Sequence, residues 1–393
     1  MGGSASARPS APAGWYTGRM ARWGLRTVYA AGAVLVLILA LLALTPQGRA
    51  AWNAALFVTQ NVPSLPDVTW LQPEPVHLKA TVPTPEGPRD ADIYRPPDDG
   101  PHAAVVLFLG VAPAGPDDPR VVYVASGLAR ANIVTLVYWS PEKITGRIHP
   151  PDIQNLVAAF RYLQARPYVD PRRVGFAGFC VGASFALMAA AQEEVRDQVA
   201  FVNAFGPYYS LRDLVWAFGA RSTSPYGEGQ APWTPDRLTV RVATTLLLES
   251  LAASDSDRVR QAVDAGVPLA ATEFSSEAHA VYRLLAGGTP SEVDAALGDL
   301  PPALLATMEE ASPRTYVPGL TAPVLVMHDR NDTMVPSAES RRLVADLAPR
   351  GDVRYTEFSL FEHLDPTRPL GPLDTARELG KLFGHMYAIM RQA

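Results

Sequence analysis

Short apolar runs alternate with segments of helical spacing along most of this 393-residue chain, and this alternation constrains its fold more than any other feature. Strands separated by helices of about 10–15 residues are typical of βαβ units, and continuous apolar strands are typical of a sheet covered on both faces. The sequence therefore predicts an α/β protein with a doubly wound, mostly parallel sheet. The expected strands are 105–109, 133–138, 174–177, 199–205, 323–327 and 353–358, and the expected helices between them are 121–131, 153–163, 181–191, 339–347 and 373–390.

The alternation breaks once, between residues 206 and 319, where no strand pattern is convincing. Helical patterns occupy this stretch instead, at 236–251, 254–265, 275–285 and 301–310, with a short one beginning at Ser291. We therefore expect a core formed by residues 76–208 and 320–393, interrupted by a helical cap at 209–319. Ligands of open α/β sheets bind at the carboxyl ends of the strands. We interpret the cap as a lid over such a site, with added packing as the alternative.

The N-terminal region differs from the rest of the chain. Residues 27–45 form a run of 19 residues without a charge, which as a helix would be roughly 28 Å long, close to the ~30 Å thickness of the hydrocarbon layer. Arginines at 8, 19, 22 and 26 precede this run, whereas few basic residues follow it. The positive-inside rule then predicts a single-pass anchor in the lipid bilayer, with a cytoplasmic tail at 1–26, a linker at 46–75 and an extracytoplasmic catalytic domain. A cleaved signal peptide is the alternative, although its apolar part is usually about 7–15 residues long.

Composition excludes several classes of function. Hydrophobic residues make up 48% of the chain and charged residues 19%, which is enough for a large buried core. The formal net charge of −5 gives no basic surface for nucleic acid. The seven histidines are widely spaced, the chain has one cysteine, and no glycine-rich nucleotide loop occurs. The sequence therefore predicts no metal site and no cofactor.

That one cysteine, Cys180, lies in the strongest local motif of the sequence. The expected strand 174–177 leads into Gly178-Phe-Cys180-Val-Gly182, and an apolar helix begins immediately. A nucleophile in such a strand–turn–helix elbow needs strained backbone angles and small neighbours, which Gly178 and Gly182 supply. The N-terminus of the helix also favours a thiolate over a thiol. A buried structural cysteine is the alternative.

Two further residues follow expected strands in the order that such a nucleophile requires. Asp332 lies in the polar loop after strand 323–327, where the acid of a catalytic triad belongs, and Asp329 in the same loop is the alternative acid. His363 follows the last expected strand, 353–358, and precedes the last helix. A histidine that merely lies on the surface is the alternative. The order nucleophile, acid, histidine is the order found in hydrolases of the α/β class.

The motifs GFCVGAS, HDRNDTMVP and FEH together resemble the dienelactone hydrolase family of the α/β-hydrolase superfamily, over residues 76–208 and 320–390. The resemblance implies that Cys180 attacks the carbonyl of a small-molecule ester, lactone or thioester. It implies that His363 moves the proton and that Asp332 orients the imidazole. The oxyanion hole would consist of the backbone N–H groups of Val111 and Val181.

This sequence departs from the family in two respects. Family enzymes place a glutamate after the strand that ends here at Leu109, whereas this loop has no carboxylate until Asp117; Asp117, Asp118 and Arg120 are interpreted as a solvated helix start. The family also lacks a membrane anchor and a large cap. An acyltransferase using the same triad, and a non-catalytic membrane-tethered binding module, are therefore the alternative functions.

Overall fold

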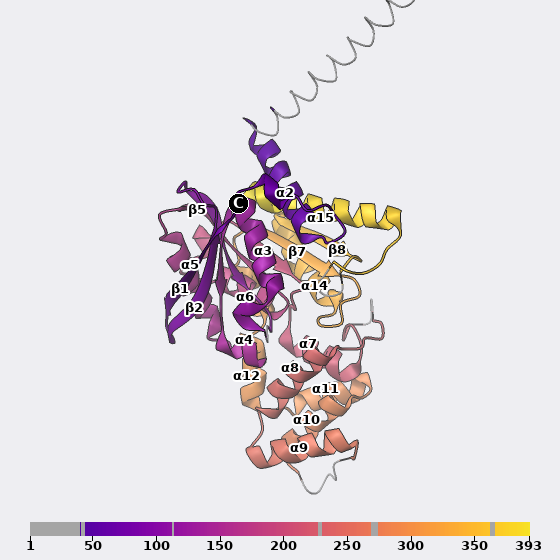
Figure 1. Cartoon of the computed structure of the whole chain (residues 1–393). Coiled ribbons are helices and arrows are strands. Elements are labelled where there is room, and N and C mark those ends of the chain that lie inside the picture. The colour runs from indigo at the N-terminus through magenta and orange to yellow at the C-terminus, as the bar shows by residue number, and fades with distance from the viewer. Residues whose placement is uncertain (1–39, 41–43, 112–113, 227–229, 269–273, 362–365) are drawn as a thin grey trace, which may run out of the picture. The chain divides into compact units, whose positions relative to one another are not determined.

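The computed structural model describes residues 40, 44–111, 114–226, 230–268, 274–361 and 366–393. In the part of the chain that includes residues 53–393, the described strands form one eight-stranded sheet of order β1-β2-β4-β3-β5-β6-β7-β8 (Figure 1). From β4 to β8 all neighbouring strands are parallel, which agrees with the predicted sheet. The strands are β1 Val76–Thr84, β2 Gly87–Arg95, β3 His102–Phe108, β4 Ile133–Tyr138, β5 Val169–Phe179, β6 Val202–Phe205, β7 Val324–Asp329 and β8 Val353–Phe358.

The first two strands form an antiparallel hairpin that the sequence analysis did not predict. Strand β1 is mostly exposed, and only Val82 is fully buried. Apolar and polar residues are mixed along this strand, so it lacks the continuous apolar run that is typical of the buried strands. Strand β2 pairs antiparallel with β4 and thereby joins the hairpin to the parallel strands.

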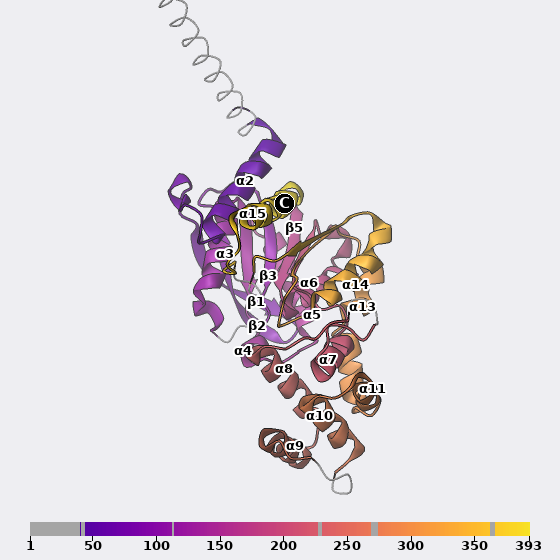
Figure 2. The same cartoon turned by 90° about the vertical axis from the view of Figure 1, so that its right-hand side faces the viewer.

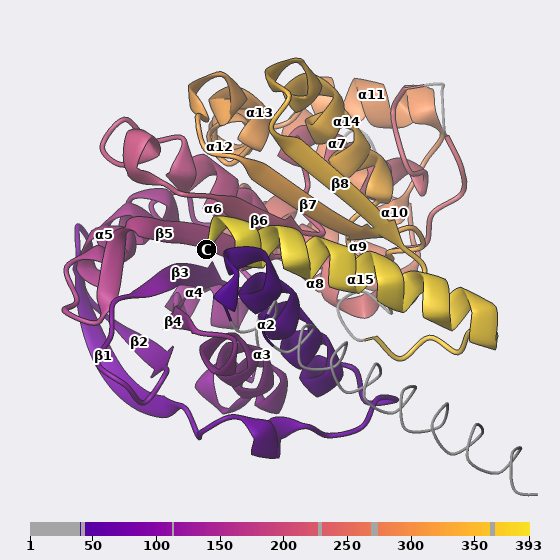
Figure 3. The same ribbon diagram turned by 90° about the horizontal axis from the view of Figure 1, so that it is seen from above.

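Helices cover both faces of the sheet, as expected for a doubly wound fold. Helices α5 (Asp152–Gln164), α6 (Val181–Ala190) and α14 (Ser337–Leu347) pack on one face. Helix α3 (Pro119–Arg130) and helix α15 (Pro372–Gln392) cover the other face, as Figure 3 shows from above. The short elements between them are α4 Pro141–Thr145, η1 Thr69–Leu71, η2 Gly115–Asp117, η3 Arg196–Gln198, η4 Val317–Gly319 and η5 Ala348–Arg350.

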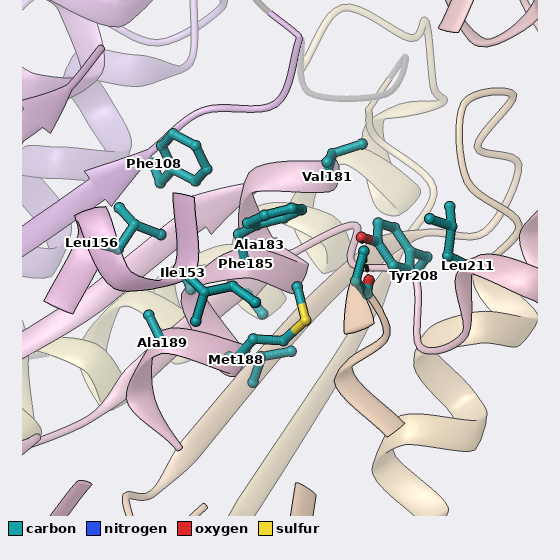
Figure 4. Packing of buried hydrophobic residues seen from close by; sticks show 14 of the residues in the cluster. Phe108, Ile153, Leu156, Val181, Ala183, Phe185, Met188, Ala189, Tyr208 and Leu211 are labelled. Atoms are coloured by element: carbon teal, nitrogen blue, oxygen red, sulfur yellow. Dashed lines mark hydrogen bonds between the residues drawn. The ribbon is translucent and has the colours of Figure 1, made fainter. Parts of the chain in front are cut away.

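Helix α6 is buried along its whole length and forms the centre of the main hydrophobic cluster. Phe185 of this helix packs edge-on against Phe108 of β3, with ring centroids 6.0 Å apart (Figure 4). Burying a side chain of this size contributes about 1.5–3 kcal/mol. Because α6 starts directly after Cys180, this packing fixes the position of that residue.

The insertion between β6 and β7 is entirely helical in its described residues apart from one isolated bridge. Its helices gather at one end of the sheet (Figure 2). Hydrogen bonds join the two ends of the insertion: Tyr208 Oη donates to the carbonyl of Ala311 at 2.7 Å, and the N–H of Leu211 donates to Ser312 Oγ at 2.9 Å. The helices are α7 Leu211–Ala220, α8 Arg237–Leu248, α9 Ala253–Ala265, α10 Ser276–Ala286, α11 Pro290–Gly298, α12 Pro302–Glu310 and α13 Pro313–Tyr316.

The segment 46–75, predicted as a linker, contains helix α2 (Pro46–Asn61). A Cβ added to Gly127 of α3 would lie 2.6 Å from Asn61 Nδ2 and 3.4 Å from Phe57 Cδ2, so the end of α2 is packed closely against α3. Phe57 therefore lies against α3. Among the described residues no helix combines the length and apolar character needed to cross a membrane. The predicted anchor, 27–45, lies almost wholly outside those residues.

A buried histidine joins the last helix to the sheet. His385 of α15 contacts Asn203 Oδ1 of β6 through Nε2 at 3.0 Å and Thr356 Oγ1 of β8 through Nδ1 at 2.8 Å. Burial, and secondarily the charge of Arg354, lower the pKa of His385 from 6.5 to about 3. The folded protein therefore keeps this imidazole neutral at pH values where the unfolded chain protonates it.

The lowered pKa of His385 predicts a loss of stability in acid. Between pH 6.5 and about 3 the unfolded state binds the extra proton, so stability is fully present above pH 6.5 and falls on acidification by ~1.4 kcal/mol per pH unit. We expect the free energy of unfolding to fall by about 2 kcal/mol more in the wild type than in His385→Gln between pH 7 and pH 5. Urea denaturation at both pH values measures this difference. An equal loss of stability in the two proteins on acidification would contradict the lowered pKa of His385.

Candidate active site

Cys180 lies in a strained turn between β5 and α6. Its φ of 54° and ψ of −129° place it outside the regions that side chains ordinarily favour, at a typical cost of about 1–3 kcal/mol. Its N–H donates to the carbonyl of Phe205 at 2.8 Å, and its carbonyl accepts from the N–H of Ala183 at 3.0 Å. The backbone on both sides of the thiol is therefore held in place, and the thiol stands at the N-terminus of α6.

The glycines of the motif allow this turn to exist. A Cβ on Gly178 would lie 2.4 Å from the carbonyl oxygen of Gly182, and a Cβ on Gly182 would lie 2.3 Å from the carbonyl oxygen of Phe108. These are backbone atoms that cannot move aside. The loop after β3 also approaches the elbow, because a Cβ on Gly110 would lie 2.9 Å from Cys180 Cβ. Close backbone approach thus accounts for each of these glycines.

Cys180 is partly exposed to a cavity of about 220 Å³ at the carboxyl ends of the strands. Val111 and Val181, the predicted oxyanion-hole residues, line the same cavity. The polar side chains of its wall are those of Asp118, Arg120, Thr239 and Cys180 itself; the rest of the wall is apolar. A concave apolar site with few polar groups is the usual form of a small-molecule site.

Two helices of the insertion form one side of this cavity. Helix α8 contributes a single face, which includes Leu238, Val242 and Leu246. Helix α7, which the sequence analysis missed, contributes Leu211, Leu214, Val215 and Phe218. The spacing of these four residues is that of an amphipathic helix and could have revealed it. In the last turn of α8, Leu246 lines the cavity, whereas Leu247 and Leu248 are buried within the insertion.

The entry to α8 is hydrogen-bonded to the loop that carries Asp332. Trp233 Nε1 donates to the carbonyl of Asp332 at 2.9 Å. The N–H of Asp236 donates to the carbonyl of Thr333 at 3.0 Å. Thr239 Oγ1 donates to the carbonyl of Met334 at 3.2 Å. The insertion and this loop are therefore mechanically connected.

The Asp332 carboxylate is buried and oriented by its own loop. Oδ1 accepts from the N–H groups of Met334 at 2.6 Å and Val335 at 3.1 Å. Oδ2 lies 3.5 Å from Nε2 of His328 and would be 3.5 Å from a Cβ on Gly206 at the end of β6. Asp332 thus lies past the end of β7, as predicted, with one oxygen held by backbone donors.

Asp329, the alternative acid, has a different environment. Its Oδ1 accepts from the N–H of Asn331 at 2.8 Å and lies 3.2 Å from Nη1 of Arg368. Burial raises the pKa of Asp329, and the Asn331 N–H and Arg368 partly oppose this rise. The ion pair with Arg368 partly compensates the burial of Asp329 Oδ1, whereas Oδ2 is buried without a hydrogen-bond partner among the described residues. His363, the predicted catalytic histidine, lies outside the described residues.

The expected solvated helix start is confirmed for Arg120, which is exposed at the first turn of α3, but not for Asp118. Asp118 is buried and caps α3, accepting from the N–H of Arg120 at 3.0 Å. Its carboxylate also accepts from Arg120 Nε at 3.0 Å and Nη2 at 2.7 Å. The pKa of Asp118 is lowered chiefly by this hydrogen bond from the Arg120 side chain. An anchored ion pair therefore lies at the rim of the cavity that holds Cys180.

Comparison with known proteins agrees with this architecture. Residues 140–213, which contain β5, Cys180 and α6, match the model of the Dienelactone hydrolase family. The solved structure of a 2,6-dihydroxy-pseudo-oxynicotine hydrolase is 14% identical, with a TM-score of 0.50 over 80% of this chain and 68% of that one. The chain therefore has the α/β-hydrolase fold. The segment that carries its elbow is similar to the Dienelactone hydrolase family.

More distant similarities extend to other enzymes. An esterase from Pyrobaculum calidifontis is 16% identical, with a TM-score of 0.47 over 87% of this chain and 91% of that one. An acylaminoacyl peptidase from Pyrococcus horikoshii is 14% identical, with a TM-score of 0.46 over 79% of this chain. The chain spans only 41% of that peptidase. No curated protein matches the chain closely.

The glycine contacts predict that the elbow tolerates no side chain. Gly182→Ala places a methyl group against backbone atoms 2.3–2.4 Å away, so we expect a loss of about 3 kcal/mol or more in the free energy of unfolding. Gly380→Ala, in the interior of α15 with open space around the added Cβ, should instead stabilise by about 0.5–1 kcal/mol. Thermal and urea unfolding of both variants tests this contrast. Similar effects of the two substitutions would refute the close approach at the elbow.

Proposed function

We propose that the protein hydrolyses esters, lactones or thioesters through an acyl-cysteine intermediate. The observation that carries this proposal is the backbone of Cys180, held at φ 54° and ψ −129° between a strand and a helix, with the side chain at an apolar cavity. Strained backbone conformations cluster at functional sites, whereas a cysteine that only fills space in the core does not require one. The matched family segment and the α/β-hydrolase fold support the same chemistry.

In the proposed reaction, Sγ of Cys180 attacks the carbonyl carbon of the substrate while its proton passes to His363. The carbonyl oxygen, now negative, would accept from the N–H groups of Val111 and Val181, and the N-terminus of α6 adds a favourable dipole. The bond to the leaving group breaks as His363 returns the proton to it. Water then attacks the acyl-cysteine and gives a proton to His363. The C–S bond breaks, His363 returns the proton to Sγ, and the acid leaves with the thiol restored.

Asp332 is proposed as the residue that orients His363. Its Oδ1 is occupied by backbone donors of its own loop, which fixes the plane of the carboxylate. Asp329 is a weaker candidate, because its carboxylate is engaged with Arg368. The insertion would act as a lid. Because Trp233 and Thr239 are hydrogen-bonded to the loop around Asp332, a movement of the lid would also move this carboxylate.

The triad predicts that Asp332 and His363 act as one unit. We expect Asp332→Asn and His363→Ala each to lower kcat by roughly 10²–10⁴-fold, and the double variant to lose little more than the worse single one. Cys180→Ala should abolish turnover. Asp329→Asn is the matched control, with an expected loss of about tenfold or less. Hydrolysis of p-nitrophenyl butyrate by the full chain measures these rates.

Two outcomes would change the assignment. Multiplying losses from Asp332→Asn and His363→Ala would show that the wrong acid has been chosen. Products made with an added alcohol or amine would distinguish acyl transfer from hydrolysis, because a transferase forms a new ester or amide in place of the free acid. If no turnover depends on Cys180, the hydrolase and acyltransferase functions are both excluded, and a non-catalytic binding module is the function that remains.

We further propose that residues 27–45 anchor the enzyme in a membrane with the catalytic domain outside the cytoplasm. The support is the uncharged run of 19 residues and the arginines that precede it. A fluorescent reporter that matures only in the cytoplasm, fused after Ala393, should therefore be dark in cells. The same fusion lacking residues 1–45 should be bright. A bright signal from the full chain would reverse the orientation.

A further inference from the structure

A second cavity, of about 100 Å³, lies between the sheet and the helices of its α3/α15 face. Its lining residues include no charged side chain, and its polar ones are Asn61 and Asn203. Asn61 Nδ2 donates to the carbonyl of Phe57 at 2.9 Å, and Asn203 Oδ1 contacts His385 Nε2 at 3.0 Å. The remaining wall is formed by aliphatic, aromatic and methionine side chains, so the cavity is largely apolar.

This cavity adjoins the one that holds Cys180. Leu107 of β3, Val124 of α3 and Phe179 of β5 line both. Phe179 is also the residue immediately before Cys180. These three side chains are therefore shared by the wall of the cavity at the thiol and the wall of the second cavity.

A small residue in the centre of the sheet leaves this space open. Ala177 lies on β5 between Leu107 of β3 and Asn203 of β6. Although β5 is a central strand, Ala177 keeps 9% of its surface accessible, whereas Phe176 beside it keeps 0%. Side chains from α15, among them Met386 and Ile389, form the opposite wall without filling the gap.

Such a space is unusual in a protein core. Cores are close-packed, and voids much larger than a water molecule are few, because an unfilled volume destabilises the fold. An apolar cavity of this kind does not hold water, which needs polar partners, but it does accept apolar ligands. The absence of charge in the wall also disfavours a ligand with ionic or hydroxyl groups, which would lose hydrogen bonds on entry.

We propose that this second cavity receives the distal part of the acyl chain whose carbonyl carbon Cys180 attacks. The substrates would then be esters or thioesters of straight aliphatic acids, with the carbonyl at Cys180 and the methyl end between the sheet and α15. Methionine in the wall suits this role, since its flexible side chain adapts to chains of different length. The inference rests on the proposed hydrolase function and names its substrate class.

Substitutions that fill or enlarge the cavity test this proposal. Ala177→Leu fills it, and should lower the ratio of kcat/KM for p-nitrophenyl decanoate to that for p-nitrophenyl butyrate by at least tenfold. Ala103→Leu is the matched control: Ala103 is also buried on that face of the sheet, but it does not line the cavity. The ratio should stay at the wild-type value in this control. The full chain is assayed in phosphatidylcholine vesicles, and comparison between variants cancels the partition of each ester into lipid.

A second pair of variants covers the case in which Ala177→Leu does not fold. Met386→Ala enlarges the cavity and should raise the same ratio, or move the optimum to longer esters, by threefold or more. Met390→Ala, a buried methionine one turn further along α15 and outside the cavity wall, should leave the ratio unchanged. The proposal is overturned if ester hydrolysis depends on Cys180 but no cavity variant changes the chain-length ratio. If the wild type hydrolyses no ester, the hydrolase function itself fails and this inference fails with it.

Discussion

The close approach of backbone to backbone at the elbow is the constraint on which the rest of the site depends. Gly182 lies against the end of β3, Gly178 lies against the start of α6, and Gly110 brings the loop after β3 towards Cys180. A positive φ at Cys180 is tolerated because these contacts and the bond from its N–H to Phe205 leave it no alternative. Helix α6, which is fully buried and begins directly after Cys180, keeps the elbow rigid.

The insertion contributes to the site in two ways. One face of α8 and one face of α7 supply much of the apolar wall of the first cavity. The hydrogen bonds from Trp233, Asp236 and Thr239 connect the same region to the loop around Asp332. A displacement of α8 would therefore change both the shape of the cavity and the position of a carboxylate. The hydrogen bonds therefore couple the shape of the cavity to the position of the Asp332 carboxylate.

Much of the fold could be predicted from the sequence, because buried parallel strands are continuous apolar runs. Strands 133–138 and 353–358 have the predicted bounds in the structure. The β1–β2 hairpin was missed because β1 is mostly exposed and neither strand is a continuous apolar run. Helix α7 was missed since it follows β6 closely, and helix α2 since prolines and aromatics suggested a linker. The elbow was predictable because its glycines are dictated by local sterics. The second cavity was not, because it depends on side chains such as Ala177 and Met386 that meet only in the folded chain.

The way in which the two ends of the insertion are joined has a consequence for cooperativity. Tyr208 is fully buried, donates to Ala311 across the base of the insertion, and belongs to one hydrophobic cluster with residues of the sheet and of α10 and α11. The helices of the insertion and the sheet should therefore melt together as one thermodynamic unit, without an intermediate in which the lid alone has unfolded. Any opening of the site would then take place by small shifts of α8 on an intact scaffold.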